Sequence, residues 1–454
     1  MTSETRKSIH GTWTGKWTFI LAAAGSAVGL GNIWKFPYMA GEYGGGAFVL
    51  VYLVCILLIG VPIMIAEILL GRRGRRSPAN TMAYLAVEAR AFPQWKYLGM
   101  MGAVAGLLIL SFYSVAAGWA FAYIFEEFNG TSAEYYGQEF DSFLKDETRL
   151  ILFHSIFIFA TIFIVAREVI KGIEIWINRL MPILFIIVVL LCVYATQTGA
   201  FFEGVSYLFT PDFSKINAKV ILAALGQAFF TLSLGMGAIM AYGAYMPANQ
   251  NIGSTALYVA FLDTLVALLA GIAIFPIVFA NNLEPAVGPG LVFVTLPWAF
   301  VNMPLGIIFG KLFFVLLTIA ALSSAISLLE PGVAWIVESL KIKRYIAAAG
   351  LGFIAWTLGI FSALSFDLLA GFTPIGDKNF FDSLDFLSNQ VLLPLGGIFI
   401  AIFVGWVMKR SDVFEELNLK EGLVLKAWFF LLKFVSPLVV GLIFVLAVFF
   451  GVVT

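Results

Sequence analysis

An all-α polytopic membrane protein is the fold class that the sequence predicts, and two observations predict it. Of the 454 residues, 61% are hydrophobic and only 12% are charged, whereas a soluble chain of this size carries roughly a quarter charged residues. The apolar runs are long and continuous rather than alternating, which favours helices over the strands of a β-barrel. The net charge of zero gives no reason to expect a nucleic-acid partner, and the expected surrounding is a lipid bilayer.

Eleven apolar runs lie between clusters of charged residues, and a span takes about 20 residues to cross a hydrocarbon core of about 30 Å. The predicted spans are residues 17–41, 45–70, 97–125, 150–166, 172–198, 220–246, 254–281, 310–338, 345–362, 384–408 and 427–452. The stretch 285–306 is also apolar but holds four prolines. It is therefore predicted to be a re-entrant or covering loop rather than a span.

Lysine and arginine predict the orientation of the spans, because they gather on the cytoplasmic side. With eleven spans, one side receives Arg6, Lys7, Lys16, Arg72, Arg73, Arg75, Arg76, Arg90, Lys96, Arg167, Lys171, Lys341, Lys343, Arg344, Lys409, Arg410, Lys420 and Lys426. The loops on the other side are acidic or neutral, as in residues 126–147. A multi-pass protein with a cytoplasmic N-terminus and an extracellular C-terminus is therefore expected.

Two of the predicted spans contain residues that weaken a helix near its middle. The first reads "AAAGSAVGLGNIWKFP" (22–37) and the sixth reads "AFFTLSLGMGAIMAYGAY" (228–245). Glycine costs a helix about 1 kcal/mol relative to alanine, although small residues can also serve tight helix packing. Spans 1 and 6 correspond if five spans are repeated, and paired interruptions of this kind indicate a transporter whose broken helices bind ions and substrate at the bilayer midplane.

Four motifs carry a resemblance to a known family. They are "GSAVGLGNIWKFPY" (25–38), "YGGGAF" (43–48), "FFTLSLGMG" (229–237) and "ALSSAIS" (321–327). The chain resembles the neurotransmitter:sodium symporter family over its whole length, and within that family it is similar to bacterial transporters of hydrophobic amino acids. Many members have twelve spans, so the predicted eleven depart from that pattern only at the periphery.

The resemblance implies a LeuT-like fold with a 5+5 inverted repeat. Residues 1–198 would form the first half, residues 220–408 the inverted half, and residues 427–452 an additional span. It also implies a symporter of the cell membrane, not an enzyme, that imports neutral aliphatic and aromatic L-amino acids with sodium by alternating access. A monomer would suffice for transport.

Two sodium sites follow from the resemblance, and sodium as a hard cation prefers the oxygen ligands that these positions offer. The first would take Ala27, Asn32, Thr231 and Asp263, completed by the substrate carboxylate, and the second would take Gly25, Val28, Ala320, Ser323 and Ser324. Serine hydroxyls in a membrane helix can instead bond back to the preceding turn, and this alternative stays open for both serines.

Asp263 departs from the family pattern, which has asparagine at this position. A carboxyl group inside a span is costly and indicates function; it could stay charged beside sodium or take up a proton. In chloride-dependent relatives a serine one helical turn later helps to hold the anion, and here that residue is Ala267. Tyr52 and Gln227 match other parts of the anion site. We therefore expect the carboxylate to replace chloride.

The substrate pocket implied by the resemblance lies between spans 1, 3, 6 and 8. Its residues would be Ser26, Ala27, Gly29, Leu30, Gly31, Ile109, Tyr113, Phe230, Thr231, Ser233, Met236, Ser324 and Leu328. Tyr113 would donate its hydroxyl to the substrate carboxylate, unless it only bonds another helix. Relatives that carry monoamines have an aspartate at the position of Gly29, so the ligand here must bring its own carboxylate. The uncharged lining disfavours charged side chains.

Gates above and below the pocket also follow from the resemblance. Lys35 and Asp385 match the outer charged pair, with lysine in place of arginine. Trp13 matches an N-terminal anchor at the inner side. The arginine that usually pairs with Glu338 is His10 here, so the inner pairing of Glu338 with His10 stays open, and Arg6 or Lys7 could take its place.

Other polar residues are expected to serve the scaffold. Glu67 and Glu330 would join structural networks, and His154 would lie at the start of a span. Gly172 and Pro182 either allow the fifth span to unwind or mark an ordinary helix start and kink.

Three other functions are alternatives to a sodium-coupled symporter. A channel would need repeated polar rings along a pore, and an enzyme would need a catalytic constellation, which His10 and His154 do not suggest. A proton-coupled permease or osmolyte carrier of the same fold stays open.

Overall fold

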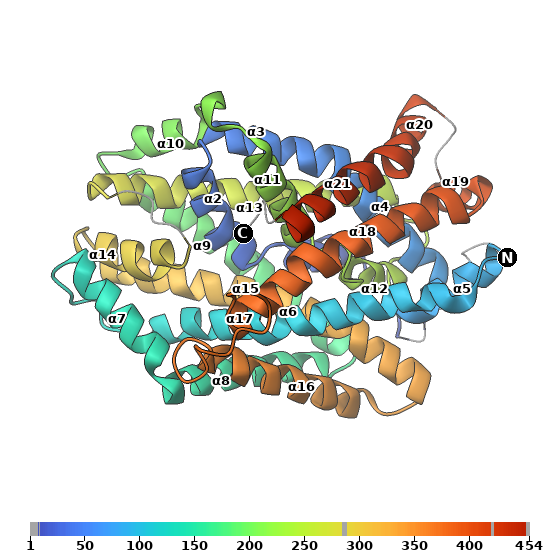
Figure 1. Cartoon of the computed structure of the whole chain (residues 1–454), viewed down its shortest axis with the longest axis horizontal. Helices are drawn as coiled ribbons and strands as arrows, with labels where there is room; N and C mark the ends of the chain where they lie inside the picture. The colour runs from blue at the N-terminus through green and yellow to red at the C-terminus, as the bar shows by residue number, and fades with distance from the viewer. Residues whose placement is uncertain (1–7, 9, 284–287, 419–421, 451–454) are drawn as a thin grey trace.

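The structure, a computed structural model, describes residue 8 and residues 10–283, 288–418 and 422–450. These residues are nearly all helical, and most helices run along one axis (Figure 1). The short helices α7 (Ala133–Lys145), α10 (Phe201–Phe209) and α14 (Leu296–Val301) lie at one end of the bundle. At the other end lie α5 (Pro78–Glu88) and α19 (Arg410–Leu417), with the N-terminus.

Nine helices of the described residues are long and apolar enough to cross a membrane, or ten if one bent pair is a single span. Four of the nine spans are Gly46–Gly74 (α3 and α4), Pro93–Tyr123 (with α6, Lys96–Tyr123), Glu147–Val165 (α8) and Gly172–Ala195 (with α9, Ile175–Ala195). The next three are Ile252–Ala280 (α13), Gly306–Leu340 (α15) and Arg344–Leu364 (α16). The last two are Phe380–Val407 (with α17, Phe380–Asp385, and α18, Leu393–Ile402) and Leu423–Phe449 (with α20, Leu423–Phe430, and α21, which runs to Phe450). The bent pair is Lys16–Ala27 (α1) with Gly31–Glu42 (ending in α2, Phe36–Glu42), at 55° to each other.

The predicted sixth span differs from the others because it is formed by two short helices. Helix α11 covers Ala218–Thr231 and α12 covers Ala238–Ala244, so neither alone has the length of a span. Between them the backbone takes left-handed conformations at Ser233, Gly235 and Gly237 (φ 54°, 79° and 76°). A Cβ on Gly235 would lie 2.3 Å from the carbonyl oxygen of Leu393. Glycine is thus required where the two half-helices meet.

The predicted covering loop is partly helical. In residues 288–306 a π-helical turn at Leu291–Thr295 leads into α14. Phe293 packs against Trp34, Trp119 and Tyr123, whose ring centroids lie 5.0–5.8 Å away. The segment therefore closes over the end of the bundle, as the prolines indicated, whereas residues 284–287 lie outside the described residues.

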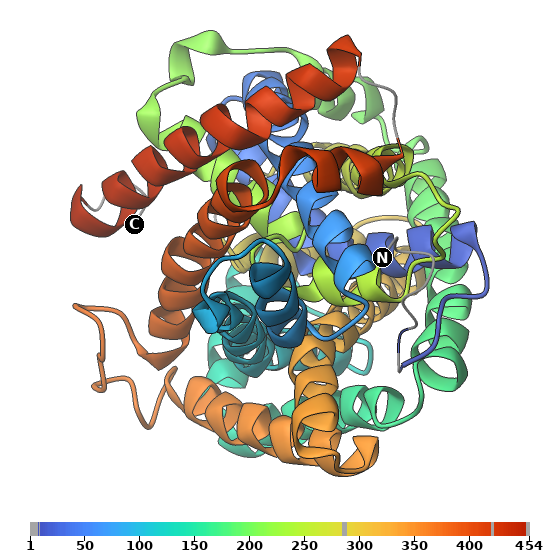
Figure 2. The same ribbon diagram turned by 90° about the vertical axis from the view of Figure 1, so that its right-hand side faces the viewer.

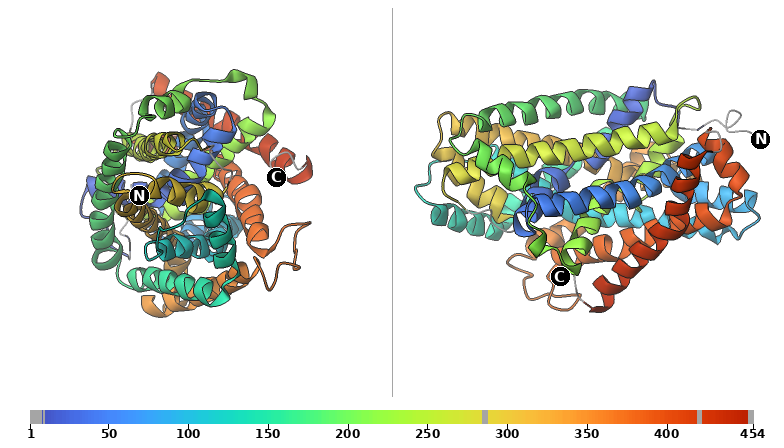
Figure 3. Two further views of the ribbon diagram at one scale, coloured as in Figure 1. Left: turned by 90° about the vertical axis from the view of Figure 1, so that its left-hand side faces the viewer. Right: turned by 90° about the horizontal axis from the view of Figure 1, so that it is seen from above.

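The last spans lie at the outside of the bundle, as the end view shows (Figure 2). Helix α21 (Ser436–Phe450) crosses the bundle at a steep angle and packs against α18 (Figure 3). Helices α6 and α15 pack against each other. The half-helices α1 and α12 of the two broken spans also contact α15. Val28, Leu232 and Leu234 are buried, so both breaks lie inside the bundle.

Candidate functional site: a central cavity between two broken helices

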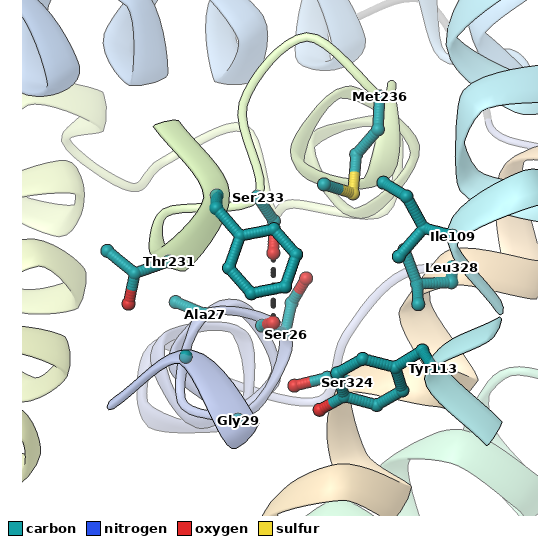
Figure 4. Close-up of a pocket in the computed structure, with 12 residues that line it drawn as sticks. Ser26, Ala27, Gly29, Ile109, Tyr113, Thr231, Ser233, Met236, Ser324 and Leu328 are labelled. Carbon is teal, nitrogen blue, oxygen red and sulfur yellow. Dashed lines mark hydrogen bonds between the residues drawn. The ribbon is translucent and has the colours of Figure 1, made fainter. Parts of the chain in front are cut away.

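A small cavity of about 20 Å³ lies at the breaks of both interrupted spans (Figure 4). Its lining residues are Ser26, Ala27, Gly29, Gly31, Ile109, Tyr113, Phe230, Thr231, Ser233, Met236, Ser324 and Leu328. These are the predicted pocket residues with one exception, Leu30, which lines a second cavity further out. These lining residues include no charged side chain, and the hydroxyls of five of them supply the polar side-chain groups.

Tyr113 of α6 reaches the backbone of the first broken span. Its hydroxyl oxygen accepts a hydrogen bond from the Leu30 N–H at 3.2 Å, and a hydroxyl that accepts can still donate its proton to a ligand. A Cβ on Gly29 would lie 2.5 Å from Ser324 Oγ and 2.7 Å from the Tyr113 hydroxyl. The Tyr113 hydroxyl therefore faces open backbone only because residue 29 has no side chain.

Serine hydroxyls join the two broken spans and α15. Ser233 donates to the Ser26 carbonyl at 2.9 Å, as Figure 4 shows. Ser26 donates to Ser327 Oγ at 2.7 Å, and Ser327 donates to the Ser324 carbonyl at 2.8 Å. Ser327 is a residue of this site that the sequence analysis missed, although its place one turn after Ser324 on the same helix face was a usable signal.

The four residues predicted for the first sodium site lie together. Asn32 Nδ2 donates to Asp263 Oδ1 at 2.7 Å and to the Asp263 carbonyl at 3.0 Å. Thr231 donates to the same carboxylate oxygen at 2.9 Å, and Tyr52 reaches the other one at 3.4 Å. Asp263 lies on α13 and has no exposed surface.

The Asp263 carboxylate forms no ion pair with any residue that the structure describes, and its hydrogen bonds come from neutral donors. A buried charge without a partner costs several kcal/mol, so a bound cation fits this place. The Ala27 carbonyl, the Asn32 side-chain oxygen and Thr231 can supply further oxygen ligands. In this geometry Asn32 Oδ1 accepts the Gly29 N–H at 3.0 Å, which fixes the amide next to the cavity.

The residues predicted for the second sodium site also lie together, between α1 and α15. Ser324 Oγ lies 3.2 Å from the Val28 carbonyl and 3.4 Å from the Gly25 carbonyl. Ser323 donates to the Ala320 carbonyl at 2.9 Å. The alternative in which a serine hydroxyl bonds to a carbonyl of the preceding turn therefore occurs at Ser323. Ser324 instead bridges α15 and α1. All five residues offer neutral oxygens, which suits a monovalent cation.

A second, larger cavity of about 230 Å³ lies outside the central one, and Gly31, Tyr113 and Phe230 line both. Its outer walls include Lys35 and Asp385, the predicted outer pair. Lys35 and Asp385 form no ion pair with each other. Lys35 Nζ instead lies 5.3 Å from the Phe230 ring centroid, and Asp385 accepts a hydrogen bond from Asn389 at 2.6 Å. The outer pair is therefore not closed by a direct contact.

The opposite end of the path is closed. His10 Nε2 lies 3.0 Å from Glu338 Oε1, so the inner pairing that the sequence left open is made by His10. Arg6 and Lys7 lie outside the described residues. Imidazole can take the place of arginine because Ser77 and Asn80 satisfy the rest of the carboxylate. Trp13 is 2% exposed. Its indole donates to the Tyr242 carbonyl at 3.1 Å and its backbone N–H to the Tyr245 carbonyl at 2.9 Å.

Two of the other acids join the scaffold as expected. Glu67 accepts the Gly235 N–H at 2.7 Å, and Glu330 accepts from Tyr245 at 2.8 Å and pairs with Arg344. His154 was misplaced, because it lies in the second turn of α8 with no exposed surface. Its ring nitrogens lie 3.1 Å from Ser114 Oγ and 3.1 Å from the Trp356 carbonyl, so it joins three helices.

The beginning of the fifth span is a π-helical turn, Ile170–Glu174, that contains Gly172. A Cβ on Gly172 would lie 2.7 Å from the Ile164 carbonyl, and Pro182 lies inside α9. The Glu174 carboxylate accepts a hydrogen bond from Thr14. The irregular turn agrees with a span that can unwind, which stays a prediction.

A helical membrane protein with two interrupted helices around a central cavity belongs to the class of secondary transporters. The family model described as the sodium:neurotransmitter symporter family matches residues 10–135 and 138–452. The chain belongs to this family of sodium-coupled transporters, which are not enzymes.

Individual relatives agree with this assignment. The chain is 38% identical to the uncharacterized sodium-dependent transporter YhdH of Bacillus subtilis, over 95% of this chain and 96% of the relative. It is 34% identical to an uncharacterized sodium-dependent transporter of Haemophilus influenzae, over 96% and 97%. The crystal structure of MhsT in complex with L-phenylalanine is similar with a TM-score of 0.88 and 45% identity, covering 98% of this chain and 100% of that chain.

Proposed function

We propose that this protein is a symporter that imports neutral hydrophobic L-amino acids together with two sodium ions by alternating access at the cell membrane. The observation that carries the proposal is the uncharged central cavity beside the buried Asp263 carboxylate. A substrate carboxylate would find the Tyr113 hydroxyl and backbone groups at Gly29. Ile109, Met236 and Leu328 would face its side chain, and Met236 can adapt its shape to aliphatic or aromatic groups.

The two gates support an orientation for this transport cycle. The end closed by His10, Trp13 and Glu338 would be cytoplasmic, because the basic loops gather there. The end with Lys35 and Asp385 would face outward, and the larger cavity there would be the approach to the binding site. A single chain contains both halves of the path, so a monomer suffices in this proposal.

Uptake into proteoliposomes tests the function. Labelled phenylalanine should accumulate under an inward sodium gradient, and leucine and tryptophan should compete. Tryptamine lacks the carboxylate and should compete at least tenfold more weakly; competition equal to that of tryptophan would contradict the proposal. The variant Gly29→Ala should lose substrate binding, since its methyl group would meet Ser324 Oγ and the Tyr113 hydroxyl.

Asp263 also supports a second candidate, a proton-coupled permease of the same fold. Its carboxylate accepts only from neutral donors, so a proton could neutralise it in place of a cation. Uptake driven by a pH gradient without sodium would favour this candidate. Uptake that requires sodium and persists without a pH gradient would exclude it.

A further inference from the structure

Helix α10, between the fifth and sixth predicted spans, has an apolar face that the described residues leave largely uncovered. Phe202 is 84% exposed and Phe209 is 46% exposed, and Val205 between them is partly buried. These three positions are spaced as i, i+3 and i+7, so they lie on one side of the helix. A contiguous face of large exposed apolar side chains indicates a surface that meets something other than water.

A second face of α10 is buried against the membrane span α13. Gly204 and Leu208 are the buried residues of this helix. A Cβ on Gly271 of α13 would lie 2.9 Å from Leu208 Cδ2, and a Cβ on Gly204 would collide with the backbone of Pro276. Figure 1 shows α10 lying beside α13. The helix is therefore fixed on the side of a span and is not a free loop.

The third face of α10 is polar. Glu203, Ser206 and Thr210, which follows the helix directly, also repeat as i, i+3 and i+7, and all three are exposed. They line a polar groove together with Asp212 and Lys215. Around the helix the exposed apolar face lies between the buried face and the polar face. This order is typical of a helix that lies at the boundary between lipid and water.

The partners of α10 on α13 give its depth in the membrane. The span Ile252–Ala280 has 29 residues. At about 1.5 Å per residue it is about 43 Å long, so a centred span extends beyond a hydrocarbon core of about 30 Å by about 7 Å at each end. Pro276 lies about 6 Å and Gly271 about 14 Å from the end of the span at Ala280. Helix α10 therefore lies where the headgroups meet the hydrocarbon, with its C-terminal end deeper than its N-terminal end.

The C-terminal end of α10 also contacts the turn that follows the first broken span. The Tyr207 hydroxyl donates to the Gly41 carbonyl at 2.7 Å, and the Gly46 N–H donates to the Thr210 carbonyl at 3.2 Å. This turn contains the motif "YGGGAF" (43–48) and joins α2 to α3. The position of α10 thus supports the end of α2, one half of the first broken span.

We propose that α10 is inserted into the membrane leaflet at this end of the bundle. Phe202, Val205 and Phe209 lie among the acyl chains next to the headgroups, and the polar face lies toward water. Lipid is the occupant of the apolar face because that face carries no charged group and lies at the depth of the boundary. The span α9 also packs against α13 and exposes Val189 and Val193 by 49% and 55%, as expected where lipid surrounds the bundle.

Spin-label accessibility of the full chain in nanodiscs of phosphatidylethanolamine and phosphatidylglycerol tests the proposal. A nitroxide is attached to the variant Phe202→Cys and, as the matched control on the polar face of the same helix, to Ser206→Cys. Both variants also carry Cys55→Ala and Cys192→Ala, which remove the native thiols. The relaxing effect of oxygen, which concentrates in hydrocarbon, is compared with that of a water-soluble nickel chelate. The label at position 202 should respond to oxygen and lose the response to nickel, and the label at position 206 should respond to nickel.

A nickel response at position 202 equal to that at position 206 would place the apolar face in water and overturn the proposal. Protection of position 202 from both probes would mean that protein covers the face, and this result would also overturn it. The variant Phe209→Cys gives a second reading of depth and replaces Phe202→Cys if that variant does not fold. Its ratio of oxygen to nickel response should exceed that at position 202, because Leu208 contacts the deeper residue Gly271. A lower ratio would contradict the depth on which the proposal rests.

Discussion

The two candidate cation sites lie on opposite sides of the first broken helix and differ in charge. The first contains the buried carboxylate of Asp263, held by Asn32 and Thr231 at 2.7 Å and 2.9 Å. The second consists of neutral oxygens from α1 and α15, with Ser324 between the carbonyls of Gly25 and Val28. Both sites border the central cavity, the first through Ala27 and Thr231 and the second through Ser324.

This difference separates two tasks that sodium can perform. At the first site a cation would compensate a fixed charge and stand next to the substrate carboxylate, so sodium and substrate should stabilise each other. At the second site a cation would tie α1 to α15 without touching the substrate. Loss of the first site should therefore weaken both ligands, and loss of the second should weaken mainly sodium.

The largest effect is expected for Asp263→Ala. The change removes a charged ligand and three hydrogen-bond acceptor contacts, and a contact to a charge contributes up to about 3 kcal/mol. Sodium affinity at this site should fall more than a hundredfold, and substrate binding should fall with it. Sodium titrations of phenylalanine binding to the purified variant, checked for folding, measure both.

Asp263→Asn is the matched variant, because it keeps the shape and one oxygen but removes the charge. It should bind sodium more tightly than Asp263→Ala and less tightly than the wild type. Equal behaviour of Asn and wild type would show that the charge has no part in cation binding.

The next effect is expected for the double variant Ser323→Ala, Ser324→Ala. Two oxygens leave a dehydrated cation, each contributing roughly 1.5 kcal/mol or more, so sodium affinity should fall at least about tenfold. Phenylalanine affinity at saturating sodium should fall less than after Asp263→Ala. Only Ser324 of the two serines lines the central cavity, and the second cation does not touch the substrate carboxylate. A sodium dependence that matches the wild type would refute the assignment.

The single variants sharpen this result. Ser324 bridges two carbonyls of α1, whereas Ser323 donates within its own helix to Ala320. Ser324→Ala should therefore cost more sodium affinity than Ser323→Ala. The reverse order in the same titration would mean that the bridge across the helices is not used.

The parts of this comparison that the sequence predicted are those with a local signal. Glycines at 235 and 237 indicated the break of the second interrupted helix, and they adopt the positive φ angles that only such residues adopt easily. The pocket and both sodium sites were assigned by resemblance, and the structure brings the assigned residues together.

Contacts between distant segments had no such signal. The residue types alone left the His10–Glu338 pair open. The sequence does not show that Ser77 and Asn80, which lie 258 or more residues before Glu338, also hydrogen-bond its carboxylate. His154 was placed at a span start, but the packing of α6, α8 and α16 decides its partners. The short helices α5, α7 and α10 were not predicted, because the segments between the predicted spans were used only for their charge.

A small effect is expected for Gly25→Ala, which alters the second site without removing an oxygen. The new methyl group would lie 3.0 Å from Met181 Sδ and 3.5 Å from Ser323 Cβ. A methionine side chain is flexible and can move by a few tenths of an ångström, and the Gly25 carbonyl stays in place. Sodium affinity should change by less than about threefold; a loss as large as that of the double serine variant would show that the site cannot relax.

Sodium-driven uptake is expected to be unaffected when chloride is removed. This result would distinguish the first sodium site from one that needs a bound chloride ion. The Tyr52 hydroxyl reaches Asp263 Oδ2 at 3.4 Å, and Gln227 donates to the Gly31 carbonyl at 2.7 Å, so both groups are engaged without an anion. Ala267, one turn after Asp263, offers no donor. A chloride ion here would also meet the negative charge of the carboxylate at short range, where repulsion is strong. Sodium-driven uptake of phenylalanine into proteoliposomes should therefore be the same with gluconate in place of chloride. A several-fold loss of uptake in gluconate, restored by adding chloride back, would mean that Asp263 does not take the place of the anion.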